Sequence, residues 1–290
     1  METSLFFKTF VVFGSQLGLL FGACYYFIFE ARKSVLAGEK FLGETFEAKY
    51  NKKGELDLFS PEQEKVHEKI KNLQLEIKEL YKVKGPIGEF RENEKERVKK
   101  VGELKNKIQE EAFNGPLAEL QVVLTVPWFL TLLLTVFLSF SEISIWIKML
   151  SLTAATAMFA PLLGIILINM DENDGLRMIK LTVLLTFVTA IVGMYSGIDF
   201  SALGYILIIP LGILVTWNFL SIFYNFSSWK KRAMGFFGAI TFIFYLLFDF
   251  NRLQQQSDAG VNNWNTAFEI GFSIYLDVIN LLLELLEAMG

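Results

Sequence analysis

Residues 263–290 read NWNTAFEIGFSIYLDVINLLLELLEAMG. The stretch predicts one apolar helix whose polar side chains recur at steps of three and four residues: Glu269, Ser273, Asp277, Asn280, Glu284 and Glu287. This spacing places every polar group on one stripe of the helix. An ionisable group at membrane depth costs several kcal/mol unless it faces a partner or water. Asp277 is therefore predicted to face inward, whereas Glu284 and Glu287 are interpreted as solvated charges near the helix end.

A second carboxylate lies upstream in FYLLFDFNRL, where Asp249 follows a long apolar run. We predict that Asp249 and Asp277 face each other inside a helical bundle. If both helices run up to a turn near residue 260, the two residues are offset by roughly 9 Å, a gap that an asymmetric loop or a helix tilt would close. Two carboxylates in a poorly hydrated site cannot both ionise cheaply, so the pair should share one proton. The alternative is a structural pair that only stabilises helix packing.

The composition indicates a membrane protein with a charged insert. The chain is 53% hydrophobic and contains 29 Phe, which is too apolar for a soluble protein. Of its 27 Lys and Arg residues, 19 fall within residues 31–117, where 17 acidic residues nearly balance them. This balance gives no reason to expect nucleic acid as a partner. The lone Cys24 lies in an apolar segment and cannot form an internal disulfide, so redox chemistry has no support.

The apolar runs predict an all-α protein with a bundle of seven transmembrane helices. Residues 1–30 form the first span, and residues 117–290 form six more, at about 117–140, 144–169, 177–196, 200–226, 232–254 and 264–288. Pro127, Pro161 and Pro210 lie inside three of these spans and should kink them. In the first span, glycines recur every four residues at Gly14, Gly18 and Gly22. They predict a groove for close helix packing, or they merely reflect membrane composition.

Residues 31–116 are predicted to form a soluble helical insert. Phe41, Leu42, Phe46 and Tyr50 suggest a short amphipathic helix, and Ser60 with Pro61 marks the start of a longer one. Apolar residues then repeat at the steps of a coiled-coil seam: Val66, Ile70, Leu73, Ile77 and Leu80. After a break at 84–88, a second helix to about residue 113 should fold back against the first. The resulting coiled-coil-like hairpin is either an arm that docks a protein partner or a solvated spacer.

The distribution of basic residues outside the insert predicts the membrane orientation. Trp229, Lys230, Lys231 and Arg232 form the strongest basic cluster there. Because basic residues favour the cytoplasmic side, this cluster places the insert and the C-terminus in the cytoplasm. We expect an integral multi-pass protein of the bacterial plasma membrane.

Four stretches resemble the Bax inhibitor-1 (transmembrane Bax inhibitor motif) family in its bacterial branch: LTAATAMFAPLLGI, GIDFSALGYIL, GFFGAITFIFYLLFDFNRL and SIYLDVINLLLELL. The likeness covers nearly all of the chain except residues 31–117. It implies a seven-helix bundle around a central final helix and a proton-sensitive leak for calcium or other cations. It also implies that Asp249 and Asp277 match the family's hydrogen-bonded, pH-sensing aspartate pair. Within the family pattern, the usual Asp-Thr-Gln reads Asp249-Phe250-Asn251 here.

Three classes of function follow from these patterns. The first is a pH-gated cation leak or transporter, in which Glu269, Ser273 and Asn280 add oxygen atoms to those of the two aspartates around a transient calcium ion. The second is a regulatory or assembly subunit whose residues 60–112 dock a membrane complex such as a protease. The third, an enzyme, has little support because the spans contain no His and no metalloprotease or serine-hydrolase motif. An aspartyl protease using the two aspartates is its one conceivable form. No resident metal or cofactor is expected.

Overall fold

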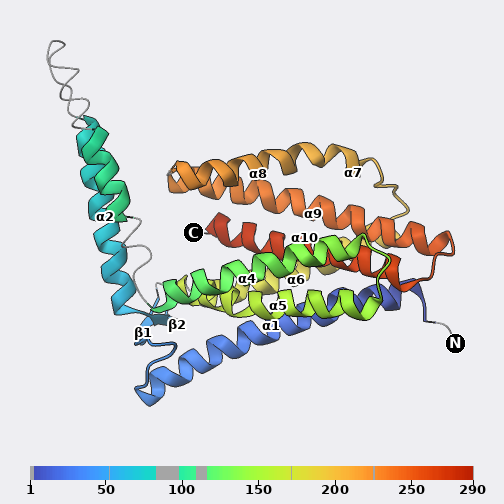
Figure 1. Cartoon of the computed structure of the whole chain (residues 1–290), viewed down its shortest axis with the longest axis horizontal. Coiled ribbons are helices and arrows are strands. Elements are labelled where there is room, and N and C mark those ends of the chain that lie inside the picture. Colours follow the sequence, from blue (N-terminus) through green and yellow to red (C-terminus); the bar gives the residue numbers. More distant parts are fainter. Residues whose placement is uncertain are drawn as a thin grey trace, which may run out of the picture. The chain divides into compact units, whose positions relative to one another are not determined.

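The computed structural model describes residues 3–51, 53–82, 98–108, 116–170, 172–224 and 226–289. The described chain is mostly helical, with one short β-hairpin (Figure 1). It divides into two compact units, Met1–Phe27 with Pro127–Gly290, and Ile28–Val126. The first unit contains the candidate site.

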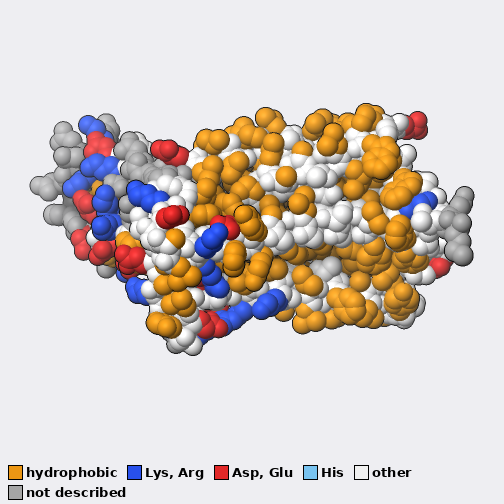
Figure 2. All heavy atoms as spheres, turned by 90° about the horizontal axis from the view of Figure 1, so that it is seen from below, with side chains coloured by type: hydrophobic (Ala, Val, Ile, Leu, Met, Phe, Trp, Pro, Cys, Tyr) orange, Lys and Arg blue, Asp and Glu red, His pale blue; other side chains and the backbone are white. Residues whose placement is uncertain are grey.

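The helices follow the predicted apolar runs closely. Their bounds are α1 Leu5–Ala37, α4 Pro116–Ser139, α5 Ile145–Asn169, α6 Glu172–Tyr195, α7 Leu203–Ile206, α8 Ile208–Phe223, α9 Ser228–Asp258 and α10 Trp264–Met289. Among the described residues, six stretches are long and apolar enough to cross a membrane: Leu5–Ala37, Glu119–Ser139, Ile145–Asn169, Glu172–Tyr195, Leu203–Ser221 and Ser228–Asp258. Hydrophobic side chains dominate the visible surface of this helical bundle (Figure 2). Such a surface is suited to lipid rather than to water.

Proline affects the helices differently according to its position. The span predicted at 200–226 is two helices, α7 and α8, which meet at Leu207. Pro210 has no N–H to donate to the carbonyl of Ile206, and this missing bond accounts for the break. Pro127 and Pro161 instead lie inside the continuous helices α4 and α5.

Helix α10 lies at the centre of the first unit. Both its apolar and its polar faces are buried, including Asp277 and Glu284. A Cβ added at Gly271 would lie 2.9 Å from the Val12 side chain, so α1 approaches α10 closely there. The Tyr275 hydroxyl lies 2.8 Å from that of Thr156 on α5. Because neighbouring helices cover α10, its four acidic residues need not face lipid.

The glycines of the first span lie on an exposed face of α1. A Cβ added at Gly14, Gly18 or Gly22 would meet no described atom within 4 Å. Close packing within the chain therefore does not occur at these three positions. The opposite face of α1, with Leu20 and Cys24, is the buried one, and the Cys24 thiol lies 3.5 Å from the carbonyl oxygen of Ala160.

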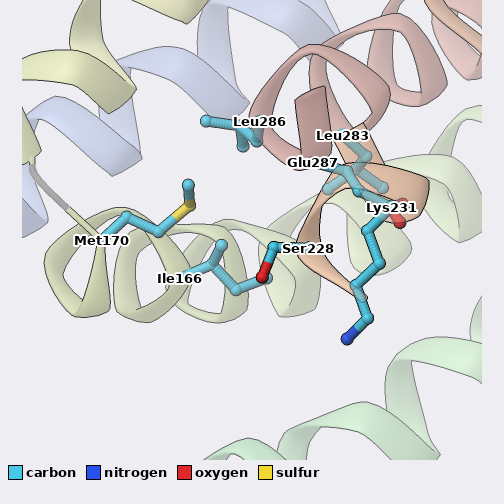
Figure 3. Close-up of a pocket in the computed structure, with 7 residues that line it drawn as sticks. All are labelled: Ile166, Met170, Ser228, Lys231, Leu283, Leu286 and Glu287. Atoms are coloured by element: carbon cyan, nitrogen blue, oxygen red, sulfur yellow. The ribbon is translucent and has the colours of Figure 1, made fainter. Parts of the chain in front are cut away.

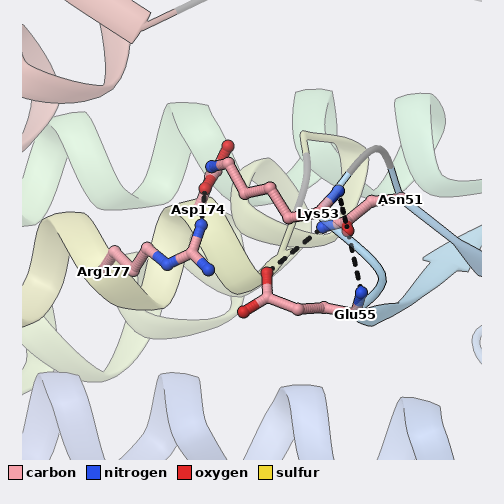
Figure 4. A network of polar contacts seen from close by, with 5 residues as sticks. All are labelled: Asn51, Lys53, Glu55, Asp174 and Arg177. Carbon is pink, nitrogen blue, oxygen red and sulfur yellow. Dashed lines mark hydrogen bonds and ion pairs between the residues drawn. The ribbon is translucent and has the colours of Figure 1, made fainter.

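In the second unit, the prediction of a short amphipathic helix around residues 41–50 is wrong. Strands β1 Glu47–Tyr50 and β2 Leu56–Phe59 form an antiparallel hairpin in which Glu47 is opposite Phe59. The Asn51 side chain accepts hydrogen bonds from the backbone N–H groups of Lys53 and Glu55, both at 2.9 Å (Figure 4). Gly54 adopts a φ of 76°, which a glycine allows without strain. The turn residues thus favour a hairpin over a helix.

The helix α2, Pro61–Lys82, begins at the predicted proline. Its apolar seam residues are each half-buried: Val66, Ile70, Leu73, Ile77 and Leu80. Residues 98–108 are also helical, with Val101 and Leu104 buried. Lys100 Nζ lies 3.7 Å from Glu76 Oε1, which joins this segment to α2. The predicted turn at 84–88 and the end of the second helix near residue 113 lie outside the described residues.

Candidate functional site

Two glycines bring α9 and α10 into close antiparallel contact. A Cβ added at Gly235 would lie 2.5 Å from the backbone N of Ala288, and one at Gly238 would lie 2.3 Å from Glu284 Oε2. Any other residue at these positions would push the helices apart. The contacts also fix the register of the two helices.

This register explains how the two aspartates meet. Moving eleven residues from Gly238 to Asp249, and the same number back from Glu284, places Asp249 opposite Ser273. Asp277 then lies one turn further along α10. Side-chain hydrogen bonds connect Asp249 to Ser273 and to Asp277. The register therefore reduces the offset of roughly 9 Å expected from the sequence to one turn, and the side chains span the remainder.

The aspartate pair is shielded from water and incompletely bonded. Asp249 is 2% exposed and Asp277 is 8% exposed. The Oδ2 atom of each is buried and receives no hydrogen bond from any described residue. Buried polar atoms normally have partners. A proton shared between the two carboxyl groups would supply a donor without any further residue.

Arg252 provides the positive charge at this site, and sequence reasoning missed it. It lies three residues after Asp249 on α9 and interacts electrostatically with that carboxyl group. Its Nη2 atom also lies 3.7 Å from Glu269 Oε2. Glu269 thus faces Arg252, and its half-exposed side chain sits at the edge of the site rather than inside it. The three-residue spacing on one helix could have indicated this contact.

Of the other residues predicted to bind a cation with the aspartate pair, only some lie beside it. Asn280 is half-buried one turn beyond Asp277, and none of the described residues forms a hydrogen bond with its side chain. Ser273 contacts Asp249. Across the described ranges, no group of three or more His, Cys, Asp or Glu residues is placed to hold a metal ion. A calcium ion at the pair would therefore need hydroxyl, amide and water oxygens to complete its shell of six to eight.

The fold and this buried pair can be compared with known proteins. The model of the family described as inhibitor of apoptosis-promoting Bax1 matches residues 110–290, more than half of the chain. The chain belongs to the Bax inhibitor-1 family. It is therefore an integral multi-pass membrane protein of a non-enzymatic family. No curated protein sequence matches the chain at the significance required.

The Bax inhibitor-1 match includes both helices that carry the site, α9 and α10. Residues 1–109, with α1 and most of the insert, lie outside it. Both aspartates, Ser273 and Asn280 lie inside it, as do the glycines that bring α9 and α10 together.

Two buried lysines bind the α9–α10 turn and the start of α10, and no pattern in the sequence indicated their burial. Lys148 is 1% exposed, and its Nζ donates to Ser139 O and Asn265 Oδ1, both at 3.2 Å. Lys8 donates from Nζ to Asn262 O at 3.1 Å and to Asn262 Oδ1 at 3.0 Å. Both ammonium groups also lie near aromatic rings, Phe268 and Trp264 respectively. Hydrogen bonds to neutral oxygen atoms and contacts with aromatic rings thus stabilise the ammonium groups of Lys8 and Lys148, which apolar surroundings alone would destabilise.

A cavity of about 440 Å³ opens at the other end of α10 (Figure 3). Its walls come from the end of α5, the start of α9 and the end of α10: Ile166, Met170, Ser228, Lys231, Leu283, Leu286 and Glu287. Most of this lining is apolar, and the Lys231 side chain extends away from the other residues (Figure 3). The cavity is separate from the aspartate pair.

Proposed function

We propose that the chain is a pH-sensitive leak channel or transporter for cations such as calcium, gated by Asp249 and Asp277. The observation that supports this most is the buried contact between two carboxyl groups, each with an oxygen atom that receives no described donor. Membership of the Bax inhibitor-1 family, together with the resemblance at both aspartates, favours the same function.

The proton shared by the pair acts as the gate in this proposal. While it is present, it bridges the carboxyl groups and holds α9 against α10. When it is lost, two negative charges face each other in a poorly hydrated site and repel. The helices then separate, or a cation enters and balances the charges. Asp249, Asp277, Ser273 and Asn280 would supply oxygen atoms for a weak, transient site, as conduction requires.

Reconstitution in liposomes tests the proposal. Calcium flux would be measured over a range of pH for the native protein and for D249N and D277N. The native flux should change with pH, and both variants should lose that change because one carboxyl group can no longer ionise. D258N makes the same chemical change at an exposed end of α9 and serves as the control. A native flux that does not vary with pH and is unaffected by D277N would contradict the gate.

We also propose that α10 is a seventh membrane span and that the insert and the C-terminus face the cytoplasm. Helix α10 is long enough at 26 residues, and its acidic stripe is covered by neighbouring helices. The basic residues at the start of α9 favour this orientation. Labelling with an impermeant thiol reagent tests it. N72C on the insert should react only after bacterial cells are opened, and D258C should react in intact cells.

The alternative function is an assembly or regulatory subunit whose arm docks a membrane complex such as a protease. The half-buried seam of α2 and the Glu76–Lys100 ion pair support a helical arm over residues 60–112. A solvated spacer would have the same features without a partner. Affinity purification with and without residues 60–112 distinguishes them. Partners that disappear with the deletion favour docking, and the same partners or none in both samples count against it.

A further inference from the structure

Glu284 is buried in the contact between α9 and α10, which corrects its interpretation as a solvated end charge. Its side chain is 9% exposed. The carboxylate occupies the space that Gly238 leaves open, because a Cβ there would lie 2.3 Å from Oε2. Within the described structure, no hydrogen bond or ion pair reaches this carboxylate. A carboxyl group held in this way is costly to ionise unless a cation compensates its charge, and it otherwise keeps a proton.

The position of Glu284 relates it to the aspartate pair. It lies seven residues, two turns or roughly 10 Å, beyond Asp277 on the same side of α10. Asn280 lies between them on that stripe. Of these three, Glu284 meets Gly238 of α9 and Asp277 meets Asp249 of α9. The stripe therefore leads from the buried pair toward the end of the bundle that carries the cavity.

The charged groups around this end are unevenly placed. The Glu287 carboxylate repels a negative charge on Glu284, and the positive charge of Lys231 attracts the Glu287 carboxylate. On the helices that pack against α10, the charged residues at the same end are Glu172, Asp174, Arg177 and Lys180 on α6 and Lys230, Lys231 and Arg232 on α9. Arg177 pairs with Asp174 (Figure 4). The lysine of α5, Lys148, lies at the opposite end.

We propose that Glu284 is a second cation-binding station, reached after the aspartate pair by an ion that moves along the stripe of α10. This inference rests on the proposed cation leak and adds a residue to it. A hydrated cation that leaves Asp277 meets the amide oxygen of Asn280 and then the Glu284 carboxylate. The cation compensates the buried charge, and the incomplete set of protein ligands keeps binding weak enough for release. Gly238 allows the Glu284 carboxylate to occupy this position because it has no side chain there.

Three substitutions in liposomes test the station. E284Q keeps the shape of the side chain and removes its charge, and calcium flux should fall roughly tenfold, which corresponds to about 1.4 kcal/mol. The pH at which flux changes should stay that of the native protein, because the aspartate pair is intact. E284D restores the charge and should recover part of the flux. D258N removes a carboxylate at the exposed far end of α9 and should leave the flux unchanged.

A second measurement separates this inference from the proposed function. Infrared difference spectra, recorded on adding calcium to the protein in vesicles, should contain a carboxylate band that E284Q removes and D258N keeps. If the native protein carries no flux, the leak is wrong, and the loss of this band in E284Q still supports a binding station. If D277N abolishes pH dependence while E284Q matches the native flux and spectrum, the station is wrong and the leak stands. An equal loss of flux in E284Q and E284D would also overturn it, because the charge would then not be what matters.

Discussion

The hydroxyl groups of Thr156 and Tyr275 lie 2.8 Å apart in the interior of the bundle and join α5 to α10. Tyr275 is two residues from Asp277, so this bond holds the part of α10 that carries the aspartate pair. Both side chains are buried, and water cannot replace either partner.

Removing one partner of this bond should have unequal effects. T156V leaves the Tyr275 hydroxyl buried without its partner and should destabilise the fold by ~1–3 kcal/mol. Y275F should cost less, since the Thr156 hydroxyl can still donate to the carbonyl of Leu152 one turn earlier. Thermal unfolding in detergent measures both. Equal losses would show that the Thr156 hydroxyl has no such acceptor.

Alanine at two glycines should have opposite consequences. G235A places a methyl group 2.5 Å from the Ala288 backbone and should destabilise the α9–α10 contact by ~1–3 kcal/mol. G14A meets open space on the exposed face of α1 and should be neutral or stabilising by up to ~1 kcal/mol, because alanine favours a helix. Unfolding midpoints in detergent compare them, and a tolerated G235A would contradict the close approach.

Asn251 ties α9 to the loop after α6. Its Nδ2 donates to Gly193 O at 3.1 Å and to Ile198 O at 3.0 Å, and its Oδ1 accepts from the Phe200 N–H. N251A should destabilise the fold by ~2–3 kcal/mol, since it leaves buried backbone groups unpaired, and should speed hydrogen exchange across residues 196–203. Q254A removes only hydrogen bonds to the exposed Asp258 side chain on the same helix and should change stability by less than ~0.5 kcal/mol. Unchanged exchange in N251A would mean that other contacts hold the loop.

Asp199, in the same loop, gives a pH dependence outside the membrane. Hydrogen bonds from the side chain and backbone N–H of Ser201, and then from Gln255, hold the pKa of Asp199 below its usual value. A lowered pKa means that the bonds contribute fully above the ordinary carboxyl pKa of ~3.9 and are lost as pH falls through the folded value. Exchange protection at Ser201, corrected for the intrinsic rate, should therefore persist at neutral pH and decline in acid. D199N should not show this decline, and a native protein equally protected at both extremes would contradict the assignment.

The sequence predicted the helices of the first unit well because long apolar runs leave few alternatives to spanning helices. The sequence also predicted that Asp249 and Asp277 face each other, because an acidic residue in the middle of an apolar helix needs a partner inside the bundle. The offset between them could not be resolved without the register, which depends on Gly235 and Gly238 meeting the backbone and side chain of α10.

Two failures have local causes. The region before α2 was assigned to a helix from its apolar spacing, although Asn51 and Gly54 form the turn of a hairpin. Glu284 was assigned to solvent because of its distance along the helix. Its burial depends on a glycine 46 positions earlier, which a pattern within one helix cannot reveal. The burial of Lys148 likewise depends on other helices, because its hydrogen-bond acceptors lie on α4 and α10.

The four acidic residues of α10 bear on how the protein is made. A helix that carries four carboxyl groups inserts unfavourably from the translocon into lipid on its own. In α10 these groups belong to Glu269, Asp277, Glu284 and Glu287. Helix α9 offers Arg252, Asp249, Gly238 and Lys231 along the facing side, so the two helices mask each other's polar groups. We therefore expect α9 and α10 to insert into the membrane together, as a hairpin. Mutations at its glycines should impair insertion before they impair transport.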